Sequence, residues 1–425
     1  MSTFGGYKPH VEEGAPSQPR SRPNLVLLGW LGAATVILAT VSHYAHASPH
    51  SGASMSSSIR AQEAQTRTKP WELPLSEPLV IAHRGASAAM PELAPEAYKL
   101  AIEEGADSIE CDILLTKDLR GICRHNPELD LSTNVRDQFG DRTTTKTIDG
   151  QNITGVFASD LTLAEVKQLR LVQPLPFRDQ QYNGRFQVAT MEEFLQIALD
   201  APRTVAVHLE VKHPQYHNSL PQVKAAKTSI EQIVLDAMKQ RGFAGPINSP
   251  QWLRRPSYLL CFDGSWLKKV AKLGSCIPRL LLLKGNVNEL SPDGRSIPDL
   301  TSESSLDDFA KYIDVIGPGK GLLVRPVAAH NKTADVQKPE YQSTQLAEKL
   351  HSRGFQVHVY TFREEDVYRF PSLSVNEELD LLFKKLGVDG VISDSIAPLT
   401  AYLEHQDRSQ WNMRLASAPA RRPCP

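Results

Sequence analysis

Ionisable side chains interrupt three apolar stretches of this sequence, although a charge buried without a partner is energetically costly. The stretch 79–83 ends in a histidine that an arginine follows, and the stretch 108–115 carries two acidic residues. A second histidine comes shortly afterwards, and the stretch 205–211 carries a glutamate with a lysine two positions later. The seven residues are His83, Arg84, Glu110, Asp112, His125, Glu210 and Lys212. Their accumulation is typical of a site that performs chemistry.

The three acidic residues predict a metal site. Glu110 and Asp112 are two positions apart, so on a strand both carboxylates face one side and Cys111 faces the other. Glu210 adds a third carboxylate from another strand. Oxygen ligands alone are typical of a hard divalent ion, which makes Ca²⁺ or Mg²⁺ the expected cofactor and Mn²⁺ a third candidate. Zinc would prefer histidine or cysteine ligands.

The other four residues predict chemistry on a phosphate group. Arg84 and Lys212 offer the positive charge that phosphate oxygens require. His83 and His125 form a titratable pair, of which one can accept a proton from an attacking hydroxyl or water while the other protonates the leaving oxygen. The alternative interpretation is structural, because a histidine at a strand end can be merely hydrogen-bonded and Glu210 can form a salt bridge with Lys212.

The elements that would position these residues alternate between strand-like runs and helical patterns, which predicts parallel βαβ units. The runs span 79–83, 108–115, 205–211, 258–262, 279–283, 314–317, 356–362 and 389–393. The helical patterns include 95–104, 163–169, 191–199, 227–240, 265–272, 342–351 and 377–385. Eight units predict an α/β fold of the (β/α)8 TIM-barrel type, in which catalytic groups lie at the carboxyl ends of the strands. An open doubly wound sheet is the alternative, but no glycine-rich nucleotide-binding pattern follows a strand.

The chain is expected to divide into five segments. They are a polar tail over 1–23, a transmembrane anchor or signal peptide over 24–47, a disordered stalk over 48–70, the barrel over 71–405 and a mobile tail over 406–425. Residues 127–187, after the second strand, are polar and contain one clear helical pattern. We call this segment the insertion, and loops of such length in a compact domain are usually functional or disordered.

The amino-terminal segment predicts a membrane association. Arg20 and Arg22 precede 17 uncharged residues, 25–41, and roughly 17–25 apolar residues are needed to span a bilayer. The tripeptide AHA at 45–47 resembles a signal-cleavage pattern, so the segment is either an anchor or a cleaved signal. The preceding arginines favour a cytosolic amino terminus, which places the barrel outside the cytosol, either membrane-anchored or secreted.

Composition sets further bounds on function. The 425 residues carry a net charge of -1 and are 41% apolar, as in globular proteins, with no basic excess to indicate a nucleic-acid partner. Five cysteines are too few for a disulfide scaffold, and no CxxC pair suggests a zinc site. At least one thiol is unpaired, and the pairing of the others is open, as is the oligomeric state.

Several motifs together resemble the glycerophosphodiester phosphodiesterase family. They are HRG followed by PE, then GADSIECDILLTKD, RHNPELDLSTNV and LEVK, and the similarity extends over about residues 79–403. Stretches such as LPFRDQQYNGRFQVATMEEFL resemble the larger branch of periplasmic-bacterial and plant-type members. The resemblance implies a (β/α)8 barrel with an insertion after its second strand. It also implies metal-dependent cleavage of small glycerophosphodiesters such as glycerophosphocholine to glycerol 3-phosphate and an alcohol.

The resemblance assigns the same roles residue by residue. It implies that His83 and His125 are catalytic, that Glu110, Asp112 and Glu210 hold the metal, and that Arg84 and Lys212 contact the phosphate. It further implies that Glu92 orients the first loop. The chain departs from the family's usual residues at Leu93, at Asn126, where an acidic residue is usual, and at 393–396. Two alternatives remain: a catalytically altered membrane-anchored binding protein on the same barrel, and a phospholipase-D-like lyase that forms cyclic phosphates.

Overall fold

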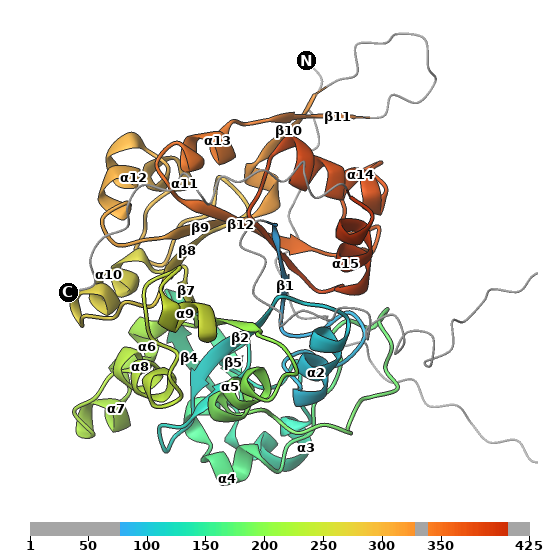
Figure 1. Ribbon diagram of the computed structural model, residues 1–425. Coiled ribbons are helices and arrows are strands. Elements are labelled where there is room, and N and C mark those ends of the chain that lie inside the picture. Colours follow the sequence, from blue (N-terminus) through green and yellow to red (C-terminus); the bar gives the residue numbers. More distant parts are fainter. Residues whose placement is uncertain (1–76, 328–338, 407–425) are drawn as a thin grey trace, which may run out of the picture. The chain divides into compact units, whose positions relative to one another are not determined.

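The computed structural model describes residues 77–327 and 339–406 (Figure 1). The expected tail, apolar segment and stalk over 1–70 lie outside the described residues. Within the described ranges, no helix combines the length and the apolar character that a bilayer crossing requires.

Eight parallel strands close into a barrel, as the alternation of strand-like runs predicts. Their order around the barrel follows the chain, and β1 closes it by pairing with both β2 and β13. The strands are β1 (Leu79–Ala82), β2 (Ser108–Leu115), β6 (Ala206–Val211), β7 (Ser257–Cys261), β8 (Arg279–Leu283), β9 (Val315–Pro318), β12 (Gln356–Phe362) and β13 (Gly390–Ser393). Each coincides within a residue at either end with a run expected from the sequence. The alternative of an open sheet is wrong, because the sheet has no free edge between β1 and β2.

Helices form the outer layer of the barrel (Figure 1). Those with six residues or more are α2 (Pro95–Glu103), α5 (Met191–Leu199), α6 (Pro214–Ser219), α8 (Ile230–Gln240), α10 (Gly264–Lys272), α12 (Glu303–Phe309), α13 (Leu346–His351), α14 (Val375–Asp380) and α15 (Ala397–Glu404). Shorter helices are α7 (Pro221–Ala225), α9 (Pro250–Arg254), α11 (Ile297–Leu300) and the 3-10 turn η3 (Lys320–Leu322). A π-helical turn, η4 (Leu381–Lys385), continues α14.

Helix α10 illustrates how local sequence determines these elements. The Asp263 side chain accepts hydrogen bonds from the backbone amides of Ser265 and Trp266, which satisfies two donors at the start of the helix. Trp266 and Val270 recur at helical spacing and are buried against the strands. The same combination of a polar cap and an apolar face recurs at α5, where Thr190 forms a capping box.

One expected helix begins in the wrong place. The pattern over 342–351 predicted a single helix, but Glu340–Ser343 form strand β11, which pairs with β10 (Val324–Val327), and α13 begins only at Leu346. Residues 340–343 alternate between exposed and half-buried positions. The amphipathic pattern therefore came partly from a surface hairpin. Over four residues, the spacing of apolar side chains does not distinguish a strand from a helix.

The insertion contains more structure than the single expected helix. It holds α3 (Val135–Phe139), the 3-10 turns η1 (Gly140–Arg142) and η2 (Ala158–Asp160), the hairpin β4 (Thr144–Ile148) and β5 (Gln151–Gly155), and α4 (Leu163–Val166). Leu129, Val156 and Leu171 belong to a second hydrophobic cluster, which also includes Leu114 at the end of β2. The insertion therefore has a small core of its own that is anchored on the barrel.

A short strand connects the barrel to the insertion. Strand β3 (Gly121–Cys123) runs antiparallel to β2, and a disulfide joins Cys111 of β2 to Cys123. Arg124 and His125 follow directly, so the chain delivers them to the carboxyl end of β2.

Candidate active site

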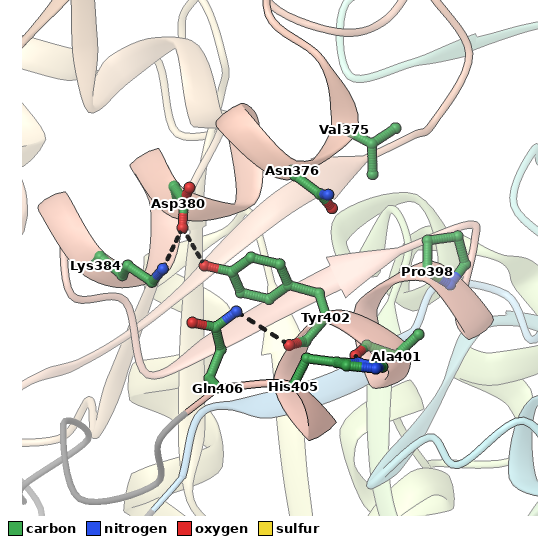
Figure 2. A pocket seen from close by; sticks show the side chains of 9 residues that line it. All are labelled: Val375, Asn376, Asp380, Lys384, Pro398, Ala401, Tyr402, His405 and Gln406. Atoms are coloured by element: carbon green, nitrogen blue, oxygen red, sulfur yellow. Dashed lines mark hydrogen bonds and ion pairs between the residues drawn. The ribbon is translucent and has the colours of Figure 1, made fainter.

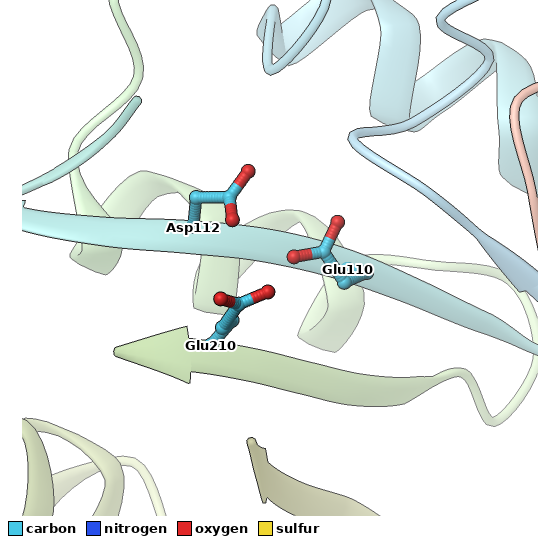
Figure 3. A group of neighbouring side chains, drawn as sticks. All are labelled: Glu110, Asp112 and Glu210. Carbon is cyan, nitrogen blue, oxygen red and sulfur yellow. The ribbon is translucent and has the colours of Figure 1, made fainter. Parts of the chain in front are cut away.

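Three carboxylates meet inside the barrel at the carboxyl ends of β2 and β6 (Figure 3). Asp112 and Glu210 are partners in the strand register, and Glu110 lies two residues earlier on β2. One oxygen from each of the three lies within 4.8 Å of the others. Because residues two apart on a strand share a face, the acidic residues point inward while Cys111 packs outward.

Two cations accompany the carboxylates. Lys212 Nζ lies 2.8 Å from Glu210 Oε1 and 3.5 Å from Asp112 Oδ1. Arg84 Nε lies 3.2 Å from Asp112 Oδ2, and the Arg84 backbone amide donates to Glu110 Oε2 at 2.8 Å. Burial opposes the charge on Lys212, but Glu210 and Asp112 outweigh burial and raise its pKa. The structural salt bridge between Glu210 and Lys212 therefore exists, and it forms part of the same cluster.

A second layer of charge surrounds Arg84. Arg84 Nη1 donates to Glu92 Oε2 at 2.6 Å, and Arg124 Nη2 donates to the Glu92 carbonyl at 2.5 Å. Burial would raise the pKa of Glu92, but Arg84 and Arg124 lower it. Arg124 is 1% exposed. The family resemblance implies a loop-orienting role for Glu92; Arg124, which completes that contact, was not expected from the sequence.

The donor set fits a hard divalent cation. Glu110 Oε1 is buried and has no hydrogen-bond partner. Burial, followed by the neighbouring Asp112 and Glu210, raises the pKa of Glu110 well above its ordinary value. With Glu92 included, four carboxylates face the three cations Arg84, Arg124 and Lys212. A bound cation would relieve this excess of negative charge, and the all-oxygen ligands suit Ca²⁺, Mg²⁺ or Mn²⁺ equally.

A tight turn at Gly85 positions His83 and Arg84. The His83 amide donates to the Ser393 carbonyl of β13 at 2.8 Å, so the strand pairing continues up to the histidine. Gly85 then adopts φ +82°, and a Cβ there would lie 2.8 Å from the Ala97 carbonyl carbon. Only glycine accommodates both the positive φ and the close approach of α2, which explains the residue after His83 and Arg84.

Asp394 contacts the His83 imidazole and was not among the candidate residues expected from the sequence. Its Oδ1 lies 2.6 Å from His83 Nδ1, and the aspartate is 2% exposed. Burial would raise the pKa of Asp394, but Arg363 and His83, followed by Arg178, lower it well below its ordinary value. The sequence contained the signal, because Asp394 directly follows the last barrel strand. Residues 393–396 had stood out only as a departure from the family's usual residues.

His125 has a different partner. Its Nδ1 lies 2.5 Å from Asn126 Oδ1, and Asn126 Nδ2 donates to Glu128 Oε1 at 2.8 Å. Burial lowers the pKa of His125 well below its ordinary value, and Arg84 and Lys212 lower it further. The Glu128 carboxylate therefore contacts His125 only through Asn126. An aspartate at position 126 would place a carboxylate directly against the imidazole.

The structure brings all seven predicted residues to one end of the barrel, at β1, β2 and β6 and directly after β3. The arrangement offers a buried cation site, two fixed positive charges and two imidazoles. In each imidazole Nδ1 faces an oxygen atom, which leaves Nε2 for proton transfer. A separate surface hollow between α14, η4 and α15 is lined by Asp380, Lys384 and Tyr402, and it contains none of the seven (Figure 2).

Comparison with protein-family models matches residues 83–397 to the Glycerophosphoryl diester phosphodiesterase family. The chain is 39% identical over 350 residues to the glycerophosphodiester phosphodiesterase GDPD6 of Arabidopsis thaliana, covering 80% of this chain and 90% of that protein. It is 27% identical over 348 residues to the glycerophosphodiester phosphodiesterase of Haemophilus influenzae, covering 75% of this chain and 88% of the relative.

A solved structure shares the fold. The crystal structure of a protein from Silicibacter pomeroyi, assigned as a glycerophosphoryl diester phosphodiesterase, superposes with a TM-score of 0.53 at 20% sequence identity. The similarity covers 77% of this chain and 93% of that one. At this identity the likeness supports the barrel fold.

Replacing Glu110 by Gln should weaken divalent-ion binding while leaving the metal-free protein as stable as before. The amide removes the negative charge that a cation requires, but it resembles the protonated carboxyl that the raised pKa of Glu110 favours without a cation. Titration calorimetry with Ca²⁺ or Mg²⁺ and denaturant unfolding with chelator measure the two effects. The matched control is Glu231→Gln, a buried carboxylate on α8 outside the cluster, which should leave ion binding unchanged. A large loss of stability in metal-free Glu110→Gln would support the structural interpretation instead.

Proposed function

The chain belongs to the glycerophosphoryl diester phosphodiesterase family and is a phosphodiesterase hydrolase, and on this premise we propose how its site cleaves glycerophosphodiesters. The substrate would be a small soluble diester such as glycerophosphocholine, and the products glycerol 3-phosphate and an alcohol. The observation that carries the proposal is the buried carboxylate cluster, which lies beside two cations and two imidazoles with free Nε2 atoms.

Glu110, Asp112 and Glu210 would hold the divalent ion through their carboxylate oxygens. When bound, the ion supplies positive charge to the nonbridging phosphoryl oxygens of the substrate. Arg84 and Lys212 lie against the same carboxylates and add N–H donors toward those oxygens. The contacts to Glu92 and Asp112 fix the Arg84 guanidinium before the substrate arrives, so little reorganisation is needed.

The two imidazoles would transfer the protons. One Nε2 accepts the proton of the attacking group, which is either the glycerol 2-hydroxyl or water, and the other donates a proton to the leaving alkoxide. Attack by the 2-hydroxyl would form a cyclic phosphate first, and release at that stage is the lyase alternative. The binding-protein alternative is disfavoured because all seven residues are present. They also lie close enough for the charges of Arg84 and Lys212 to lower the pKa values of His125 and Asp112.

His83→Ala and His125→Ala should each reduce kcat by roughly 10²–10⁴-fold, the usual contribution of a positioned proton-transfer group. Ion binding should persist, because neither histidine belongs to the carboxylate cluster. Hydrolysis of glycerophosphocholine, measured with and without chelator, tests the variants and the cofactor together. Wild-type turnover in His125→Ala would contradict the two-histidine mechanism, and full turnover in rigorously metal-free protein would contradict the cation site.

Asn126→Asp should move the limb of the pH–rate profile that belongs to His125 to higher pH. The pKa of His125 is lowered by burial and by Arg84 and Lys212, and a carboxylate at position 126 would stabilise the imidazolium and raise it. Asn126→Gln is the matched neutral control. Identical profiles for the two variants would show that charge at this position does not influence the imidazole.

We also propose that the barrel works outside the cytosol. The uncharged segment 25–41 supports this location, and so does the disulfide between Cys111 and Cys123, because disulfides are rare in reducing compartments. Fractionation should recover the full-length protein with membranes or in the secretory lumen, and alkylation without reductant should leave both cysteines unlabelled. A cytosolic protein with both thiols reactive would contradict the proposal.

A further inference from the structure

An arginine of the insertion reaches the residue that orients His83. Arg178 Nη2 donates to Asp394 Oδ2 at 2.8 Å, Nε donates to Glu365 Oε1 at 2.6 Å, and Nη1 donates to the Ser87 carbonyl at 3.2 Å. The Arg178 residue is 8% exposed although the surrounding segment is polar. One guanidinium therefore connects the insertion to the loops that follow β1, β12 and β13.

Asp394 depends on these contacts for its orientation. One carboxylate oxygen faces His83 Nδ1, and the other faces Arg178 and Arg363, each at 2.8 Å. Arg363 also lies over the ring of Tyr368, 4.5 Å from its centroid. The Arg363 contact is an ion pair without hydrogen-bond geometry, whereas Arg178 donates a directional bond. Of the two arginines, Arg178 is thus the one that holds the carboxylate by a directional hydrogen bond.

The insertion also holds the loop that carries His83. Gln173 Nε2 donates to the Ser87 and Met90 carbonyls, both at 3.1 Å. Ser87 Oγ in turn donates to the His83 carbonyl at 2.9 Å. Side chains from residues 173–178 therefore contact both sides of His83: its backbone, through Ser87, and its imidazole, through Asp394.

We propose that Arg178 is a positioning residue, through which the insertion fixes Asp394 and thereby the orientation and tautomer of the His83 imidazole. The effect on turnover rests on the proposed function of His83, whereas the effect on the imidazole does not. According to this proposal, the insertion contributes to catalysis by positioning His83. The competing account is that the buried ion pairs only attach the insertion to the barrel.

The first test compares substitutions at Arg178 in the full-length chain. Arg178→Gln should lower kcat for glycerophosphocholine by about 10- to 100-fold with little change in KM, because a displacement of about 1 Å in a catalytic group can cost 10²-fold. Arg178→Lys keeps the charge, but its single nitrogen cannot reach all three acceptors as the guanidinium does, so it should restore part of the loss. The matched control is Arg142→Gln, which removes an ion pair within the insertion, between η1 and Glu165 of α4. It should retain wild-type kcat.

The second test separates positioning from attachment. If Arg178 acts through His83, Arg178→Gln should cause no further loss of kcat when it is introduced into His83→Ala. Multiplicative losses in the double variant would overturn the proposal, as would wild-type kcat in Arg178→Gln alone.

A spectroscopic measurement tests the same proposal without turnover. Nitrogen NMR of histidine-labelled protein, with the His83 signal assigned by its loss in His83→Ala, reports which ring nitrogen carries the proton. The wild-type chain should show a protonated Nδ1 and a bare Nε2 at pH 8, whereas Arg178→Gln should show a mixture of tautomers. An unchanged tautomer in Arg178→Gln would overturn the proposal. This result does not depend on activity, so it remains decisive even if the wild-type chain cleaves no glycerophosphodiester and the proposed function fails.

Discussion

The structure depends on the repulsion between carboxylates buried side by side at the ends of β2 and β6. Glu110, Asp112 and Glu210 would destabilise an ordinary barrel, because charges removed from water require partners. Lys212 and Arg84 offset part of the cost, and the raised pKa of Glu110 shows that the compensation is incomplete. Among the described residues, this cluster is a place where a bound cation could relieve the repulsion.

Successive layers of contacts hold the compensating groups in place. Arg84 is held by Glu92, and the Glu92 carbonyl is held by Arg124, which belongs to the segment that also delivers His125. His83, the residue before Arg84, is held by Asp394. Asp394, which follows the last strand, thus contacts the loop after the first strand. The site is therefore complete only when β13 has paired with β1.

The barrel was predictable because each strand is a short apolar run that both faces of the sheet bury, and these runs stand out between polar connections. The convergence of the seven candidate residues at one end of the barrel was predictable, because titratable residues inside or next to such runs have few structural explanations. Arg178 and Glu128 were not found, because each lies away from the apolar runs, where acidic and basic residues are common, whereas Asp394 directly follows a run and was overlooked. Their importance arises from contacts across long sequence separations, as between Arg178 and Asp394, which no local period encodes. The hairpin β10–β11 was missed because four residues are too few to separate a strand from a helix.

The bond between Cys111 and Cys123 has a consequence for how the chain finds its native pairing. Side chains on a strand alternate between two faces, so a shift of β2 by one residue would turn Glu110 and Asp112 toward the helices and Cys111 into the barrel. Such a shifted strand would carry Cys111 away from Cys123, since the bridge forms on the helix-facing side. The covalent link thus fixes the β2–β3 pairing in the register that keeps Cys111 on the helix-facing side and Glu110 and Asp112 inside the barrel.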